Sequence, residues 1–272
     1  MRHCNLNDYD AFLVDVDGVL VRDSEVIPGA VEALAALQET GSVFIITNNS
    51  TRSRRGLAEH LAQLGFRIDA SAIACTAYGA ANWLAKQFGT VKVLPLGETG
   101  LTEELEAAGH RIAGDADSVA WIAAGMCRQL TYDLLSRALQ ALLAGAHLLA
   151  CNHDPTYPAP QGLQPGAGAI VGALRGMGFD PVHTIGKPSP DLYALVAAQL
   201  GIEPSHMLMI GDRLDTDILG GKNYGADTLL VQSGVSRLEE MATLGITPTW
   251  TAQDLLQAAQ GNARRLPELL PD

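Results

Sequence analysis

The stretch that most constrains the fold is Ala11–Leu20, which reads Ala-Phe-Leu-Val-Asp-Val-Asp-Gly-Val-Leu. Its four leading apolar residues predict a strand buried on both faces, as in a parallel sheet. Asp15 and Asp17 follow at the carboxyl end of that strand, where open α/β sheets bind their ligands, and Gly18 allows a sharp turn. Because buried paired carboxylates are unfavourable without a compensating charge, the stretch predicts a metal ion and cationic partners elsewhere in the chain.

Apolar runs alternate with amphipathic segments along the rest of the chain, which is typical of a parallel α/β sheet. The predicted strands are Ala11–Asp15, Val43–Ile46, Ile73–Thr76, Val91–Leu96, Val119–Ala123, Leu148–Cys151, Met207–Ile210 and Thr228–Val231. The predicted helices are Pro28–Leu37, Ser53–Gly65, Thr102–Ala108, Tyr132–Leu143, a helix capped by Ser189 with Pro190 in its first turn, and Asp254–Ala259.

The middle of the chain differs from its two ends. Its predicted strands do not end in the acidic or hydroxyl residues found elsewhere, and Asn152–Gly168 is so rich in proline and glycine that we expect no regular element there. We therefore predict a core of residues 1–78 and 184–272, interrupted by a smaller α/β domain of residues 79–183.

Charge and composition exclude several classes of protein. The 272 residues carry a formal net charge of −12, which argues against nucleic acid or anionic membranes as partners. The four cysteines fit no zinc spacing. The chain shows neither a signal-peptide core nor an apolar run of about 18 residues. We expect a cytoplasmic protein with no nucleic-acid or membrane partner.

Three predicted strands end in polar groups that suit chemistry. Asp15 and Asp17 follow the first, Thr47 and Asn48 the second, and Asp212 follows Met207–Ile210. A lysine, Lys187, stands just before a predicted helix. A lone aspartate after a strand is more often a helix cap, and a lone lysine is usually solvated. Their occurrence together and in this order predicts a functional site.

These motifs resemble those of the haloacid dehalogenase superfamily and, within it, the NagD-like or 4-nitrophenylphosphatase-like phosphatases. The resemblance covers most of the chain. It rests on Asp15-Val16-Asp17-Gly18-Val19, Thr47-Asn48-Asn49, Gly186-Lys187-Pro188, the segment Gly211-Asp212-Arg213-Leu214-Asp215-Thr216-Asp217-Ile218, and Asn152, Asp154, Pro158, Gly162, Pro165, Gly166 and Gly168 of the inserted part.

The resemblance implies a Rossmann-like core, an inserted α/β cap and Mg²⁺-dependent hydrolysis of a small phosphate monoester. Asp15 would be the nucleophile that forms an aspartyl-phosphate, and Asp17 the general acid and base. The side chains of Asp15 and Asp212 and the backbone carbonyl of Asp17 would bind Mg²⁺. Lys187 would offset negative charge, and Thr47 and Asn48 would bind the phosphoryl oxygens.

Several assignments stay open at this point. Asp217 either supports the site from outside the metal's ligands or caps a helix that begins near Ile218. The arginines at 52, 54 and 55 either form a solvated helical turn or contact substrate. His153, Asp154 and Tyr157 lie in a cap segment that could contact substrate.

The function itself has alternatives. Asp17 favours phosphate esters over dehalogenation, because a dehalogenase has no alkoxide to protonate. A phosphoryl-accepting regulatory module, or a metabolite-binding protein without turnover, would use a similar acidic sheet edge. The substrate would be a sugar phosphate, a nucleotide or a similar metabolite. Related caps often mediate dimers, so the assembly stays open between a monomer and a homodimer.

Overall fold

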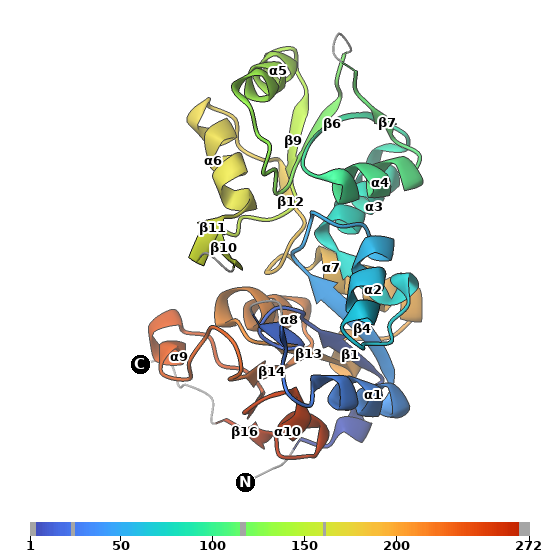
Figure 1. Cartoon of the computed structure of the whole chain (residues 1–272), viewed down its shortest axis with the longest axis vertical. Helices are drawn as coiled ribbons and strands as arrows, with labels where there is room; N and C mark the ends of the chain where they lie inside the picture. The colour runs from blue at the N-terminus through green and yellow to red at the C-terminus, as the bar shows by residue number, and fades with distance from the viewer. Residues whose placement is uncertain (1–3, 23–24, 115–117, 160–161, 267–272) are drawn as a thin grey trace. The chain divides into compact units, whose positions relative to one another are not determined.

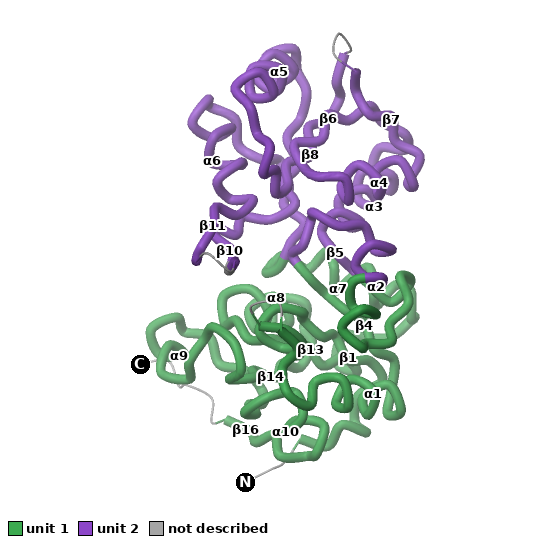
Figure 2. The backbone as a smooth tube through the Cα atoms, viewed as in Figure 1, with its two compact units in different colours: residues 1–47, 60–73, 187–272 green, residues 48–59, 74–186 purple. Residues whose placement is uncertain are grey.

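The computed structural model describes residues 4–22, 25–114, 118–159 and 162–266. The chain divides into two compact units, unit 1 with residues 1–47, 60–73 and 187–272, and unit 2 with residues 48–59 and 74–186 (Figure 2). The predicted limits of an inserted domain, residues 79 and 183, stay a prediction.

Unit 1 is built on a sheet that contains seven strands within the described residues, in the order β16-β15-β14-β13-β1-β4-β5. Its central strands β14, β13, β1 and β4 are labelled in Figure 1. Neighbouring strands from β15 to β4 run parallel, and β16 pairs antiparallel with β15. The bounds are β1 Ala11–Val14, β4 Ser42–Thr47, β5 Ile73–Cys75 (whose last two residues belong to unit 2), β13 Met207–Gly211, β14 Asp227–Val231, β15 Trp250–Ala252 and β16 Arg264–Arg265.

The register of the central strands determines which residues meet at the edge of the sheet. Val14, the last residue of β1, lies opposite Ile210 of β13 and Ile45 of β4. All four residues of β1 are buried, as expected for a strand covered on both faces. The next residues along these strands therefore reach the same carboxyl edge.

Two helices with complementary apolar stripes pack on each other in unit 1. Helix α1 buries Ala33, Leu34 and Leu37, which share one face at helical spacing, and it contacts α10. The carboxylate of Asp254 accepts a hydrogen bond from the N–H of Gln257 and so caps α10, a helix predicted over Asp254–Ala259. The helices with residues in unit 1 are α1 Ala30–Thr40, α2 Arg54–Gln63 (which begins in unit 2), α7 Asp191–Leu200, α8 Leu219–Tyr224, α9 Glu240–Leu244 and α10 Leu255–Ala259.

Short elements complete unit 1. They are the 3-10 turns η1 Leu6–Asp8, η2 Ala70–Ala72 and η3 Pro204–His206, the π-helical turn η4 Leu214–Ile218, and the paired strands β2 Val21–Arg22 and β3 Glu25–Val26.

Unit 2 has its own parallel sheet, in which five described strands follow the order β12-β9-β8-β6-β7. Its core includes Leu96, Ile122, Leu148 and Leu174, all buried. The bounds are α3 Thr76–Phe88, β6 Lys92–Leu96, α4 Thr99–Ala107, β7 Arg111–Ile112, β8 Trp121–Ala124, α5 Tyr132–Leu143, β9 His147–Ala150, β10 Thr156–Ala159, β11 Gly162–Pro165, α6 Ala167–Gly176 and β12 His183–Thr184.

The alternation of parallel strands and helices predicted from the apolar runs is confirmed, but three local expectations are wrong and one helix was not predicted. The segment expected to be irregular contains the antiparallel pair β10 and β11. Helix α3, rich in alanine, was not predicted. Helix α1 begins at Ala30 rather than Pro28. Ser189 does not cap α7, because its hydroxyl donates to the carboxylate of Asp191.

Among the described residues, no helix combines the length and the apolar character that a membrane crossing requires.

Candidate active site

The first pair of acidic residues lies directly after β1. Asp15 is 8% exposed, whereas Asp17 is exposed, so the two carboxylates that were predicted together have different surroundings. Gly18 has a positive φ of 79°, which confirms the sharp turn expected of it. A Cβ on Gly18 would lie 2.3 Å from Oδ2 of Asp212, so the lack of a side chain also leaves room for this carboxylate.

Asp212 follows β13, the strand that pairs with β1. Its carboxylate accepts a hydrogen bond of 2.7 Å from the N–H of Val235, and its carbonyl accepts one of 3.0 Å from the N–H of Ser236. A Cβ on Gly234 would lie 2.0 Å from Oδ2 of Asp212. The loop after β14 therefore holds Asp212 with backbone donors, and the lack of a side chain at Gly234 leaves room for the Asp212 carboxylate.

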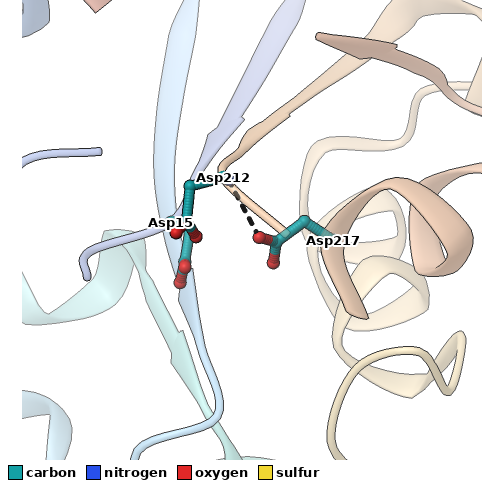
Figure 3. A group of neighbouring side chains, drawn as sticks. All are labelled: Asp15, Asp212 and Asp217. Carbon is teal, nitrogen blue, oxygen red and sulfur yellow. Dashed lines mark hydrogen bonds between the residues drawn. The ribbon is translucent and has the colours of Figure 1, made fainter. Parts of the chain in front are cut away.

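Asp217 completes the acidic cluster from the turn η4. Its Oδ2 accepts the N–H of Asp212 at 3.1 Å (Figure 3). The same oxygen accepts the N–H of Arg213 at 3.0 Å. These donors precede Asp217 in the chain, so its carboxylate does not cap the helix that follows. Its carbonyl accepts from the Tyr193 hydroxyl at 3.1 Å. Asp217 thus ties the start of the turn after β13 to its end.

Lys187 joins the acids from a distant part of the chain. Its Nζ lies 2.7 Å from Oδ1 of Asp15 and 2.7 Å from Oδ1 of Asp217, and it donates to the carbonyl of Ile46 at 3.0 Å. The lysine side chain is 3% exposed. The bonded carbonyl belongs to the residue before Thr47, so one buried ammonium links the ends of β1, β4 and η4.

The electrostatics of this cluster are dominated by burial. Burial raises the pKa of Asp15 well above its ordinary value, Lys187 opposes that shift, and Asp217 and Asp212 add to it. The pKa of Asp212 is raised to about 7 by burial and then by Asp217. Burial lowers the pKa of Lys187, but the negative charges of Asp15 and Asp217 outweigh that effect, so its pKa is raised overall. Lys187 is therefore an ammonium that only partly compensates the carboxylates.

The acidic cluster has the donor chemistry of a metal site. Within the described residues, Asp15, Asp212 and Asp217 can each offer a carboxylate oxygen such that these oxygens all lie within 4.8 Å of one another. Three carboxylates against one ammonium leave an excess of negative charge, and carboxylate oxygens are the ligands that hard divalent cations prefer.

The two predicted phosphate-binding residues have different surroundings. Thr47 is buried, 3% exposed, at the end of β4 in unit 1. Asn48 is the first residue of a segment grouped with unit 2, and its amide group donates to the carboxylate of Asp154.

The loop 232–236 was missed by the sequence interpretation. Besides holding Asp212, it supplies the Ser233 hydroxyl that donates 2.7 Å to the carbonyl of Gly18, and Oγ of Ser236 that accepts from the N–H of Leu214 at 3.1 Å. The available signal was the segment Gln-Ser-Gly-Val-Ser, which directly follows the predicted strand Thr228–Val231 and contains three polar residues.

The open assignments away from the acids have contacts of their own. Arg54 pairs with Glu104 and lies over the ring of Tyr78, and Arg55 lies 3.7 Å from Glu103. Arg213 pairs with Asp215 at 2.8 Å. His153 contacts the Thr184 hydroxyl, and the Tyr157 hydroxyl accepts from Arg128.

Comparison with known proteins identifies the family. Residues 12–111 match the family model described as haloacid dehalogenase-like hydrolase, and residues 184–258 match the model described as HAD-hydrolase-like. An acid sugar phosphatase of Staphylococcus aureus is 33% identical over 255 residues, which cover 93% of this chain and 98% of that protein.

Solved structures agree in both fold and sequence. A p-nitrophenyl phosphatase from Archaeoglobus fulgidus superposes with a TM-score of 0.87 at 34% identity, covering 93% of this chain and 99% of that one. A glycerol phosphate phosphatase from Mycobacterium tuberculosis, in complex with magnesium, superposes with a TM-score of 0.88 at 33% identity. The match covers 96% of this chain and 80% of that one. The chain belongs to the haloacid dehalogenase-like hydrolases and is a phosphatase of the NagD-like group that its motifs predicted.

Proposed function

We propose that this phosphatase hydrolyses a small phosphate monoester in two steps, through a phosphoryl group carried by Asp15, with Mg²⁺ as its cofactor. The observation that carries the proposal is the contact of one buried ammonium, on Lys187, with both Asp15 and Asp217 at 2.7 Å. A buried lysine in this place orients Asp15 and reduces the repulsion between its carboxylate and an anionic ester.

The residues present fit a divalent cation. The excess negative charge, the raised pKa of Asp212 and the grouping of three carboxylate oxygens within 4.8 Å of one another all favour a bound cation. The carboxylates of Asp15 and Asp212 and the backbone carbonyl of Asp17 would hold it. Asp217 would stay outside the ligand set, because its oxygens already face Lys187 and two backbone N–H groups. Mg²⁺ bound there would supply positive charge that reduces the repulsion between the nucleophilic carboxylate and an anionic phosphate ester.

In the first step the Asp15 carboxylate attacks phosphorus, and the bond from phosphorus to the ester oxygen breaks. Asp17, exposed beside Asp15, donates the proton that the leaving alkoxide takes up. In the second step Asp17 removes a proton from a water molecule, which attacks phosphorus. Orthophosphate leaves and Asp15 is restored. Lys187 and the Thr47 hydroxyl, both at the same sheet edge, bind the phosphoryl oxygens, together with the backbone at Asn48.

The substrate class follows from the relatives. The matched proteins are named acid sugar phosphatase, p-nitrophenyl phosphatase and glycerol phosphate phosphatase. These esters share a small leaving group on a phosphate monoester. We propose that residues 79–183 act as a cap that selects this leaving group, with a sugar or polyol phosphate as substrate and a homodimer as an assembly to test.

The first test removes the two carboxylates one at a time. We expect wild-type protein to release 4-nitrophenol steadily from 4-nitrophenyl phosphate with Mg²⁺ and to stop when a chelator is added. Asp15→Asn should abolish turnover. Asp17→Asn should retain Mg²⁺ binding and lose about 10²–10⁴-fold in rate with alkyl phosphates, whose leaving groups need a proton.

Two results would contradict the proposal. Native rates in both variants would exclude the assigned roles of Asp15 and Asp17. A single stoichiometric transfer of phosphate to the wild-type protein, without further turnover, would instead support the phosphoryl-accepting module.

A further inference from the structure

Asn48 is held by side chains from two separate segments of unit 2. Its carbonyl accepts hydrogen bonds from Nδ2 of Asn152 at 2.7 Å and from Oγ1 of Thr76 at 2.9 Å. Its own Nδ2 donates to both carboxylate oxygens of Asp154, at 3.2 and 3.1 Å. A peptide with two donors on its carbonyl and a charged acceptor on its side chain has little freedom to rotate.

The residues that hold Asn48 are themselves fixed. Oδ1 of Asn152 accepts from the N–H of Asp154 at 3.1 Å, which orients the Asn152 amide toward Asn48. Asn152 is 4% exposed and Thr76 fully buried, so water does not compete strongly for these bonds.

The same cluster packs against the residue that precedes Lys187. The N–H of Gly186 donates to the carbonyl of Cys151 at 2.7 Å. A Cβ on Gly186 would lie 2.7 Å from Oδ1 of Asn48 and 2.8 Å from Cβ of Asn152. Asn48 directly follows Thr47 and Gly186 directly precedes Lys187, so the cluster constrains the chain next to both proposed phosphoryl-binding side chains.

We propose that Asn152 and Asp154 are positioning residues for phosphoryl binding, which act by holding the Asn48 peptide and do not recognise the leaving group. The inference rests on the proposed function, in which the backbone at Asn48 binds phosphoryl oxygens. The phosphoryl group is common to all phosphate monoesters. Loss of either positioning residue therefore weakens the binding of every substrate, and of inorganic phosphate, by the same factor.

The test compares Asp154→Ala, Asp154→Asn and Asn152→Ala with wild type at saturating Mg²⁺. The dissociation constant of inorganic phosphate is measured by calorimetry, and kcat/KM is measured for 4-nitrophenyl phosphate and glycerol phosphate. We expect Asp154→Ala and Asn152→Ala to weaken phosphate binding about tenfold, because a charge-assisted or buried hydrogen bond accounts for about one decade in an equilibrium constant. Both kcat/KM values should fall by that same factor.

Two variants separate positioning from general damage. Asp154→Asn keeps an oxygen that accepts from Asn48 and should restore phosphate binding to within about threefold, since a neutral hydrogen bond replaces a charged one. Thr156→Ala, at an exposed position two residues further along, should match wild type. Thermal unfolding shows whether each variant is folded, and Asp154→Asn serves if the alanine variants are not.

The outcomes are distinct. A fall in kcat/KM for one ester only, with phosphate binding unchanged, would mean that Asp154 recognises the leaving group and would overturn the inference. Unchanged phosphate binding in both folded alanine variants would overturn it as well. Because phosphate binding is measured without turnover, a wild-type protein that binds phosphate but hydrolyses neither ester would contradict the proposed function and leave this test intact.

Discussion

At the scale of single residues, Lys187 is notable because its charged side chain is buried. Its ammonium is buried between Asp15 and Asp217 and also donates to the Ile46 carbonyl. A buried ion pair contributes little net stability compared with apolar packing, but removal of one partner leaves the other charge uncompensated. Lys187 is therefore needed for the proposed chemistry, and its positive charge also stabilises the folded chain against the repulsion between the buried carboxylates.

Lys187→Met should abolish turnover and lower the free energy of unfolding by about 3–5 kcal/mol, because two buried carboxylates lose their cation. Chemical denaturation of the Mg²⁺-free proteins measures the effect. Asp217→Asn in the same background should recover part of the lost stability, since one of those carboxylates is then neutral. No recovery in the double variant would contradict this explanation.

Asp212 predicts a dependence of stability on pH in the Mg²⁺-free protein. Its pKa is raised to about 7 in the folded chain, by burial and then by Asp217. A raised carboxyl pKa favours folding while the group is protonated, and this contribution is lost as pH rises through about 7. The Asp212→Asn variant has no group that titrates at this position. Between pH 5 and 7 its free energy of unfolding should therefore rise relative to that of wild type, by at most about 1.4 kcal/mol per pH unit.

Denaturation midpoints at several pH values, with and without Mg²⁺, check this expectation. Mg²⁺ should remove the difference by binding the ionised carboxylate. A constant difference between the two proteins across this range would show that Asp212 does not titrate there.

At the scale of elements, the site depends on glycines in the loops that follow two of the strands. Gly18 after β1 and Gly234 after β14 both face Asp212. The turn η4 then folds back so that Asp217 accepts the N–H groups at the end of β13. Parallel strands bring these loops to one edge, and the glycines let them approach closely.

Gly234→Ala should displace Asp212, because its Cβ would lie 2.0 Å from Oδ2 of that residue. We expect Mg²⁺ affinity to fall at least tenfold, as measured by calorimetry, with a smaller change in stability. The matched control is Gly172→Ala within α6, where a Cβ meets nothing within 4 Å. That substitution should leave Mg²⁺ affinity unchanged and stabilise the fold by about 0.5–1 kcal/mol, through helix propensity.

At the scale of the whole molecule, the proposed metal ligands all belong to unit 1, while unit 2 has a separate sheet and core. A metal that binds only the folded state stabilises the unit that holds it. The stabilisation is about 2.7 kcal/mol when the free metal concentration is a hundred times the dissociation constant. The effect of Mg²⁺ should therefore be uneven along the chain.

Hydrogen exchange with and without Mg²⁺ measures this unevenness. We expect the amides of β1, β13 and η4 to gain protection, and those of β8 and β9 to change little. Asp212→Asn should lose the gain in unit 1. Equal protection of both sheets would contradict a site confined to the unit 1 acids.

The motif residues and the strands were predictable because each is encoded locally. Apolar runs such as Val43–Ile46 and Met207–Ile210 identify buried strands whatever surrounds them, and the polar groups that follow lie at a common edge in any parallel sheet. The strands β10 and β11 were not predictable, because a segment rich in proline and glycine carries little local preference and here pairs through backbone hydrogen bonds. Helix α3 was missed because its buried stripe, Ala77, Ala80, Ala81 and Leu84, consists mostly of alanine, whose small side chain marks an apolar face only weakly.

By itself the sequence determined the α/β class, the family and the identity of the acids and the lysine. The tertiary structure alone decided which of these residues contact one another, because the partners lie far apart in the chain. Lys187 meets Asp15 across 172 positions, and Asn48 meets Asp154 across 106. No local pattern encodes such pairs, since they form only when the sheets bring the strand ends together.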